Sequence, residues 1–221
     1  MDLSRRSLLI ASVGTGVAAL PLAAQASSSP RPGASLADPF TLGIASGDPT
    51  ADGVVLWTRL ATDPLDESGL GGMPTRPVAV RYEVATDERF TRVVRRGAVT
   101  ARPESAHSVH VELTGLLPGR EYFYRFRTGQ HVSPTGRTRT TPAAHEMASA
   151  LTMAFASCSQ YEHGWFTAYK RLAEDEPGLV LHLGDYQYEY KAGVYEGRGG
   201  NVRDHAGPET VDLASYRQRH A

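Results

Sequence analysis

The sequence contains a single cysteine, Cys158, among its 221 residues. One cysteine cannot form an intrachain disulfide, which excludes a disulfide-stapled scaffold. The chain also has no excess of charge of either sign, because its 23 Lys and Arg residues nearly balance its 24 Asp and Glu residues. A basic field for nucleic acid is therefore not evident, and we expect no nucleic-acid partner.

A long apolar run is missing as well. The longest apolar stretch, which ends at Leu22, is interrupted by glycines and a proline and is short for a bilayer span of roughly 20 residues. It follows the twin-arginine sequence Ser4-Arg5-Arg6-Ser7 and precedes the small-x-small sequence Ala24-Gln25-Ala26. We interpret residues 1–26 as a cleaved signal peptide rather than a retained anchor. This predicts the twin-arginine translocation machinery as a partner, a periplasmic or extracellular destination, and no stable membrane span in the mature chain.

Removing residues 1–26, which carry two arginines and one aspartate, changes the formal charge from −1 to −2. The composition, 41% hydrophobic and 21% charged, is typical of a soluble globular protein with a buried core. Residues 27–39 are rich in Ser, Pro, Gly and Ala, which is typical of a linker.

Residues 40–143 show the alternation of apolar and polar side chains that is typical of half-buried antiparallel strands. The predicted strands are Val78–Val84, Val109–Leu113 and Tyr122–Phe126, with an earlier one at Val54–Leu60 and another ending at Thr140. Together they predict a small β-sandwich.

A Leu-x-Pro turn, Leu116-Leu117-Pro118, precedes the aromatic strand that starts at Tyr122. This turn resembles that of fibronectin type III domains, in which a tyrosine hydroxyl bonds back to the backbone at a corner of the sandwich. Tyr122 is either that corner residue or a plain cross-strand aromatic. The histidines of this region, His107, His110 and His131, are scattered and are interpreted as surface or strand residues rather than ligands.

The pattern changes after a connection at residues 141–149. A short apolar strand at Leu151–Ala156 is followed by helical spacing over His163–Asp175, and then by the nearly all-apolar segment Leu179–Leu183. The last segment is expected to be buried on both faces. The order strand, helix, strand predicts a right-handed βαβ unit with parallel strands.

Candidate metal ligands follow both of these strands, where the carboxyl ends of parallel strands share one edge. Cys158 is either a soft anionic ligand for iron or zinc or a small hydrophobic residue. Asp185 either coordinates, since its two oxygens could bridge two metals, or caps a turn. Tyr188 is either a phenolate ligand of a ferric ion or one aromatic residue of a Tyr-rich loop.

Four segments resemble the alkaline phosphatase D (PhoD-like) family of the calcineurin-like metallophosphoesterase superfamily. They are Phe40–Pro49, Val54–Arg59, Phe155–Ser159 and His182–Glu189. The resemblance implies a mainly β chain with an α/β part, in which a fibronectin type III-like sandwich precedes a metallophosphoesterase domain. It further implies hydrolysis of phosphate mono- or diesters with Fe³⁺ and Ca²⁺. Cys158 and Tyr188 correspond to iron ligands, and Asp185 corresponds to the catalytic carboxylate that bridges iron to calcium.

The implied mechanism uses a metal-activated water, so Ser157 and Ser159 are interpreted as loop residues that support the metal ligands rather than as nucleophiles. Residues 150–221 are expected to be only the start of the domain, because the family continues with strands that bear further ligands. His205 and His220 are interpreted as loop or surface residues rather than substitute ligands. We therefore expect the 221-residue chain alone to be inactive. The alternative is a catalytically inactive fragment whose sandwich acts as a binding or interaction module.

Overall fold

The computed structural model describes residues 37–221. The predicted signal peptide and residues 27–36 of the predicted linker lie outside this range. Within it, none of the helices combines the length and the apolar character needed to cross a membrane.

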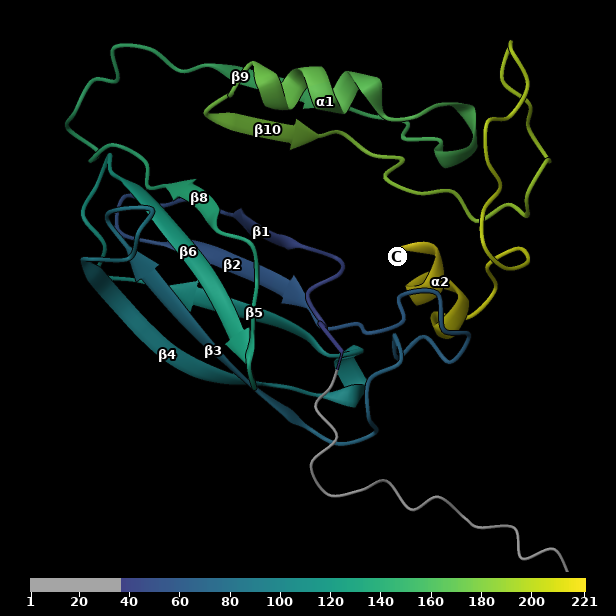
Figure 1. Ribbon diagram of the computed structural model, residues 1–221. Helices are drawn as coiled ribbons and strands as arrows, with labels where there is room; N and C mark the ends of the chain where they lie inside the picture. Colours follow the sequence, from purple (N-terminus) through teal and green to yellow (C-terminus); the bar gives the residue numbers. More distant parts are fainter. Residues whose placement is uncertain (1–36) are drawn as a thin grey trace, which may run out of the picture. The chain divides into compact units, whose positions relative to one another are not determined.

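Two antiparallel sheets form the first part of the described chain (Figure 1). One sheet has the order β1–β2–β5 and consists of β1 (Ile44–Gly47), β2 (Val54–Arg59) and β5 (Ser108–Leu113). The other has the order β4–β3–β6–β7, with β8 also paired to β6. Its strands are β3 (Val78–Ala85), β4 (Val93–Ala101), β6 (Glu121–Thr128), β7 (His131–Val132) and β8 (Gly136–Arg139).

A single apolar core joins the two sheets. Leu56 of β2, Val80 of β3 and Phe126 of β6 are fully buried in it, and they belong to one cluster of contacting side chains. The inward side chains of β5 and β6 alternate with exposed or half-buried ones, as the period-two pattern predicts. Burial of the inward faces therefore holds this part together.

Tyr122 occupies the corner position. Its hydroxyl accepts a hydrogen bond from the backbone N–H of Leu117 at 2.8 Å, and its side chain is buried. The Leu117 carbonyl accepts from the Thr140 hydroxyl at 2.7 Å. Of the two roles considered for Tyr122, the structure shows the corner role, and the Thr140 hydroxyl attaches the same turn to the residue that follows β8.

Three strands, β1, β4 and β7, were not predicted. The longest of them, β4, has Gly97 in its interior and buries only its last residue, Ala101, so its sequence lacks a clear alternation. Gly97 pairs with Tyr82 of β3, and a Cβ at this position would lie 2.5 Å from the tyrosine hydroxyl oxygen. The glycine makes room for an aromatic ring on the neighbouring strand, which only the tertiary structure reveals.

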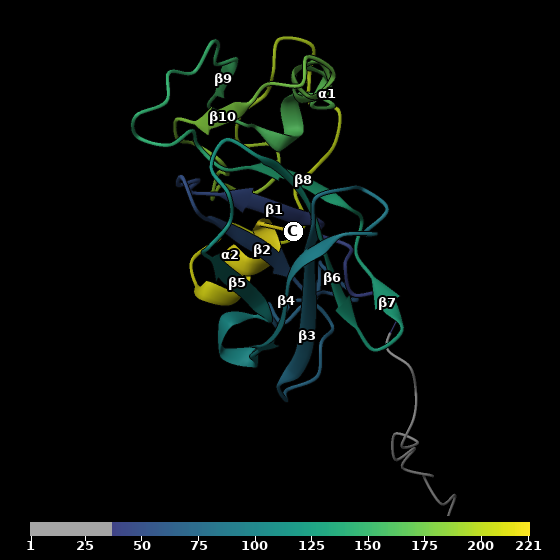
Figure 2. The ribbon, with the colours of Figure 1, turned by 90° about the vertical axis from the view of Figure 1, so that its left-hand side faces the viewer.

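The second part of the described chain has few helices. It consists of β9 (Met153–Ala156), the 3₁₀ turn η2 (Tyr161–His163), α1 (Thr167–Glu174), β10 (Leu179–His182) and α2 (Leu213–Arg219). A further 3₁₀ turn, η1 (Pro103–Ser105), lies in the first part. The strands β9 and β10 pair in parallel, and α1 lies beside them in both views (Figures 1 and 2).

Two expectations for this part were wrong. The helix begins at Thr167 rather than His163, because residues 161–163 form a 3₁₀ turn and Phe166 has a φ of 56°, which is not helical. The strand predicted to be buried on both faces is largely exposed, since Val180 and Leu181 are 46% and 41% exposed. Two strands and one short helix with no buried residue offer too little neighbouring structure to cover both faces within residues 37–221.

His107 was also misplaced by the sequence interpretation. It is fully buried at the position just before β5, not at the surface, and its φ is 58°. Its Nε2 lies 2.9 Å from the Pro74 carbonyl oxygen, so Nε2 carries the proton in that bond. His107 therefore has a structural role in the sandwich.

Candidate functional site

The candidate site lies where the chain leaves β9 and β10. The parallel pairing continues beyond the strands, since the Leu183 N–H donates to the Ala156 carbonyl at 2.8 Å and the Cys158 N–H donates to the Gly184 carbonyl at 3.2 Å. The Ser159 N–H then donates to the Asp185 carbonyl at 2.9 Å. These backbone bonds hold the two loops side by side, as expected for the carboxyl ends of adjacent parallel strands.

Both loops turn sharply at their candidate ligand. Cys158 has a φ of 58° and Asp185 has a φ of 50°, which are left-handed conformations uncommon for residues with a Cβ. Gly184, with a φ of 119°, precedes Asp185 in a conformation that favours glycine. The backbone thus directs both side chains out of the strand direction at the point where the loops meet.

The structure brings Cys158, Asp185 and Tyr188 together at one oxygen atom. Oδ2 of Asp185 accepts a hydrogen bond from the Tyr188 hydroxyl at 3.0 Å and a contact from Sγ of Cys158 at 3.5 Å. A thiol, a carboxyl and a phenol therefore converge from two loops. Each of these groups becomes an anionic donor when it loses its proton.

The protonation of Tyr188 reflects this convergence. Desolvation and the hydrogen bonds to Asp185 and Cys158 raise the pKa of Tyr188 well above its ordinary value of 10.0. In the arrangement seen here the phenol keeps its proton at neutral pH. A cation that bound to this group of donors would have to displace that proton.

Asp185 does not follow a buried strand, contrary to the burial expected for Leu179–Leu183. Both Cys158 and Asp185 are exposed, as is most of β10. What distinguishes Asp185 is instead the convergence of two donors on one carboxylate oxygen.

A polar network lies next to this group, and the sequence interpretation anticipated Ser159 in it but not Tyr169 or His182. The Ser159 hydroxyl hydrogen-bonds to the Tyr169 hydroxyl and lies 2.9 Å from Nε2 of His182, which is 3.1 Å from the same Tyr169 oxygen. These three residues come from the loop after β9, from α1 and from the end of β10. Ser159 is a loop residue as expected, but its side chain ties together the three elements that carry the site. The only signal in the sequence was its position next to Cys158.

The remaining histidine candidates line a cavity together with Ser159, Tyr169 and His182. Within the described part of the chain we find no hydrogen bond or ring contact between them and Cys158, Asp185 or Tyr188. Nε2 of His205 lies 3.2 Å from the side-chain oxygen of Gln160, and the His205 ring stacks on Tyr161. The ring of His220 lies edge-on to Trp57 at 6.0 Å. Among residues 37–221, no group of three or more His, Cys, Asp or Glu side chains is placed to hold a metal ion. The candidate set is thus two such residues, Cys158 and Asp185, together with the phenol of Tyr188.

Two regions of the sequence match one known family. Residues 24–142 match the "PhoD-like phosphatase, N-terminal domain", and residues 153–221 match the "PhoD-like phosphatase". Alkaline phosphatase D of Bacillus subtilis (strain 168) is 55% identical over 183 residues, which cover 83% of this chain and 31% of that protein. A solved structure described as "Structure of PhoD" matches with a TM-score of 0.80 at 55% identity, over 83% of this chain and 35% of that chain.

The chain spans about a third of the length of these two relatives. Its two family matches nevertheless cover more than half of its own residues, including the β-sheets and the loops that carry Cys158, Asp185 and Tyr188. The TM-score extends the similarity from sequence to fold. The chain therefore belongs to the PhoD-like phosphatase family, as the four sequence motifs predicted.

Proposed function

We propose that this chain represents the amino-terminal portion of an exported, metal-dependent phosphoric ester hydrolase of the alkaline phosphatase D type. The observation that carries the proposal is the convergence of Cys158 and Tyr188 on one carboxylate oxygen of Asp185. The similarity to alkaline phosphatase D of Bacillus subtilis supports phosphate mono- or diesters as the substrate class.

The donor set fits a ferric ion. A thiolate and a phenolate are anionic ligands that suit iron, and both lie within 3.5 Å of the same carboxylate oxygen. The protons that now lie between these groups are the ones a trivalent cation would replace. We assign Cys158 and Tyr188 as iron ligands, and Asp185 as the carboxylate that holds iron and takes part in catalysis.

The fit to calcium is incomplete. Calcium takes about six to eight oxygen ligands, and within residues 37–221 we identify only Asp185 as a candidate. The role of Asp185 as a bridge from iron to calcium therefore rests on the family resemblance.

A bound metal centre would supply Lewis acidity, which lowers the pKa of an attacking water and neutralises charge on the phosphoryl oxygens. The chain's own residues would hold and orient that centre. Cys158 and Asp185 are fixed by the backbone bonds between their loops, and Ser159 secures this arrangement through His182 and Tyr169. Because no serine nucleophile is required, the hydroxyl of Ser159 serves this structural role.

The organisation of the chain follows from the same proposal. Residues 1–26 would be the twin-arginine signal and residues 27–39 a linker. Residues 40–143 would form a fibronectin type III-like sandwich, and residues 150–221 would be the start of the metallophosphoesterase domain. The corner hydrogen bond of Tyr122 and the parallel pairing of β9 with β10 support the last two assignments.

The decisive experiment compares Asp185→Ala with an unsubstituted chain and with His110→Ala, an exposed histidine on β5. Iron content and visible absorption are measured in the 221-residue chain. Hydrolysis of a chromogenic phosphodiester is measured in a version extended to the length of the relatives. We expect the short chain to bind ferric ion weakly without hydrolysis, and the extended version to hydrolyse the ester.

Asp185→Ala should abolish both metal loading and hydrolysis, whereas His110→Ala should change neither. Retained loading and activity in Asp185→Ala would remove the role of this carboxylate. Failure of the extended version to hydrolyse any phosphate ester, combined with saturable binding of the sandwich to a polymer or protein, would favour the alternative of a binding module.

A further inference from the structure

Arg59, at the end of β2, is a buried arginine whose hydrogen bonds all go to backbone carbonyls. Its side chain is only 2% exposed. Its guanidinium donates to the carbonyls of Ala106 at 3.3 Å, Gly69 at 3.0 Å and Arg217 at 2.8 Å. Burial of a charged group is costly unless it is satisfied, so these three bonds define a specific position for the segments that supply the carbonyls.

One of these carbonyls belongs to α2. The Arg217 carbonyl lies in the last turn of the helix, where backbone carbonyls have no partner within the helix and the helix dipole favours a cation. Two further bonds attach the same helix, since Gln218 donates to the Leu65 carbonyl at 2.6 Å and Arg217 donates to the Glu104 carbonyl at 2.5 Å. The sandwich therefore holds α2 through both side chains and backbone.

A second arginine on the same helix, Arg219, binds the backbone of the loop that carries Tyr188. Nη1 of Arg219 donates to the carbonyls of Tyr188 at 2.7 Å and Tyr190 at 2.8 Å, and Nη2 donates to the Pro208 carbonyl at 2.8 Å. The planar guanidinium reaches the three carbonyls with two nitrogens held in a rigid fork, a geometry that the single ammonium nitrogen of a lysine lacks. Arg219 of α2 thereby fixes the backbone of Tyr188, whose hydroxyl donates to Asp185.

We propose that Arg59 and Arg219 form a positioning relay through which the β-sandwich sets the location of Tyr188 in the candidate site. Arg59 holds α2 on the sandwich, and Arg219 holds the segment of Tyr188 on α2. The amino-terminal sandwich thus acts as a scaffold for the metal-site loop, beyond any binding role of its own. The effect on metal binding rests on the proposed function, whereas the effect on the order of the Tyr188 segment does not.

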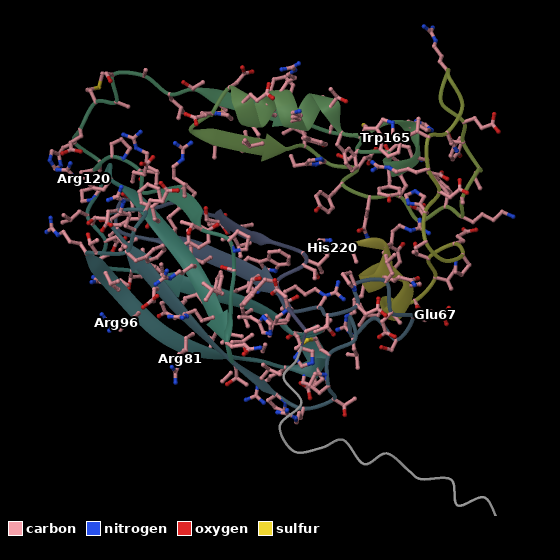
Figure 3. The ribbon with its side chains drawn as sticks, in the orientation of Figure 1. Glu67, Arg81, Arg96, Arg120, Trp165 and His220 are labelled. Carbon is pink, nitrogen blue, oxygen red and sulfur yellow. The ribbon has the colours of Figure 1, made fainter. Side chains whose placement is uncertain are left out.

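The test uses hydrogen exchange, followed by mass spectrometry, on the 221-residue chain. The variants are Arg219→Met and Arg59→Lys, and the matched control is Arg96→Met. Arg96 is exposed on β4, and its side chain projects away from the sheet (Figure 3). Arg219→Met should speed amide exchange in residues 186–195 and leave β3 and β6 unchanged. Arg59→Lys should speed exchange in both α2 and residues 186–195, although its own strand lies in the sandwich. The control should change none of these.

A second readout is ferric binding by the same proteins. Loss of an interaction that orients a metal ligand typically weakens metal affinity by about 10- to 100-fold, and we expect this range for Arg219→Met. The visible band should lose the component that Tyr188→Phe also removes. Arg219→Lys should bind ferric ion more tightly than Arg219→Met but less tightly than the unsubstituted chain, because lysine keeps the positive charge but lacks the fork of donors.

Unchanged exchange in residues 186–195 of Arg219→Met would overturn the relay, whether or not the chain binds iron. Two results together would separate the two proposals. If Arg219→Met exchanges faster in residues 186–195 but the unsubstituted chain takes up no ferric ion, the relay is supported and the proposed metal site is contradicted. If Arg59→Lys also loosens β3 and β6, the substitution has disturbed the sandwich itself. In that case the exchange of residues 186–195 in Arg219→Met decides whether the relay holds, because Arg219 lies in α2 and not in the sandwich.

Discussion

The backbone N–H of Leu117 donates to the hydroxyl of Tyr122 at 2.8 Å, across the turn that leads into β6. Tyr122→Phe removes this acceptor and leaves the ring in place. We expect a loss of about 1 kcal/mol in the free energy of unfolding, the usual net contribution of one hydrogen bond. Urea titration followed by fluorescence measures it. Tyr82→Phe is the control, because within residues 37–221 we find no hydrogen bond of the Tyr82 hydroxyl. An equal loss in both variants would deny the corner bond a specific contribution.

Gly136 of β8 lies against the ring of Tyr124, which is buried on β6. A Cβ at Gly136 would lie 2.3 Å from Cζ of that ring, so Gly136→Ala must displace a packed aromatic side chain. We expect a destabilisation of roughly 1–3 kcal/mol by overpacking. Gly47→Ala in β1 is the matched control, since no atom lies within 4 Å of a Cβ there. Thermal unfolding that shifts equally in both variants would refute this account.

His107 should make the stability of the sandwich depend on pH. Burial lowers the pKa of His107 below its ordinary value of 6.5, and Arg59 acts in the same direction while Glu104 opposes it. The unfolded chain therefore binds a proton that the folded chain does not. Stability should be full above pH 6.5 and should fall as the pH drops toward the lowered pKa, by at most about 1.4 kcal/mol per pH unit for one proton.

The measurement is urea unfolding of the unsubstituted chain and of His107→Gln at several pH values between 5 and 8. The glutamine variant can still donate to the Pro74 carbonyl but cannot titrate. The free energy of unfolding of His107→Gln should therefore depend less steeply on pH than that of the unsubstituted chain. Parallel curves for the two proteins would show that other groups carry the dependence.

Cys158→Ser tests the thiol as a ligand. A hydroxyl is a far poorer anionic ligand than a thiol at neutral pH, so we expect loss of ferric binding and of its visible charge-transfer band. Cys158 is exposed, and the free energy of unfolding without metal should change little. Ser157→Ala, at the adjacent exposed position, is the control for loop disturbance. Survival of the band in Cys158→Ser would mean that Cys158 and Tyr188 are not both ligands.

Alternation of side chains was enough to predict β3, β5 and β6, because each has one face in the common core. It was not enough for β1, which has four residues and no alternation. It was not enough for β4 either, where Gly97 leaves space for the ring of Tyr82 on β3. Local pattern records burial within a strand, whereas these features depend on neighbours that are distant in the sequence.

The candidate site shows the same division. The meeting of Cys158 with Asp185 follows from the register of two parallel strands, which is why it could be predicted. The contacts of Arg59 and Arg219 could not be, because both arginines bind backbone carbonyls, which carry no signature in the sequence. The burial expected for β10 failed for a related reason, since exposure depends on what covers a strand and not on its own composition.

The left-handed backbone at Cys158 and Asp185 predicts a conflict between thermal stability and the proposed metal site. Each such non-glycine residue costs roughly 1–3 kcal/mol relative to a relaxed conformation. Glycine or asparagine would adopt these angles more easily. Either substitution should therefore raise the stability of the fold while removing an anionic donor at position 158 or 185. A directed-evolution library screened only for heat tolerance would be expected to drift toward those residues at positions 158 and 185, and to discard the chemistry that the two loops bring together.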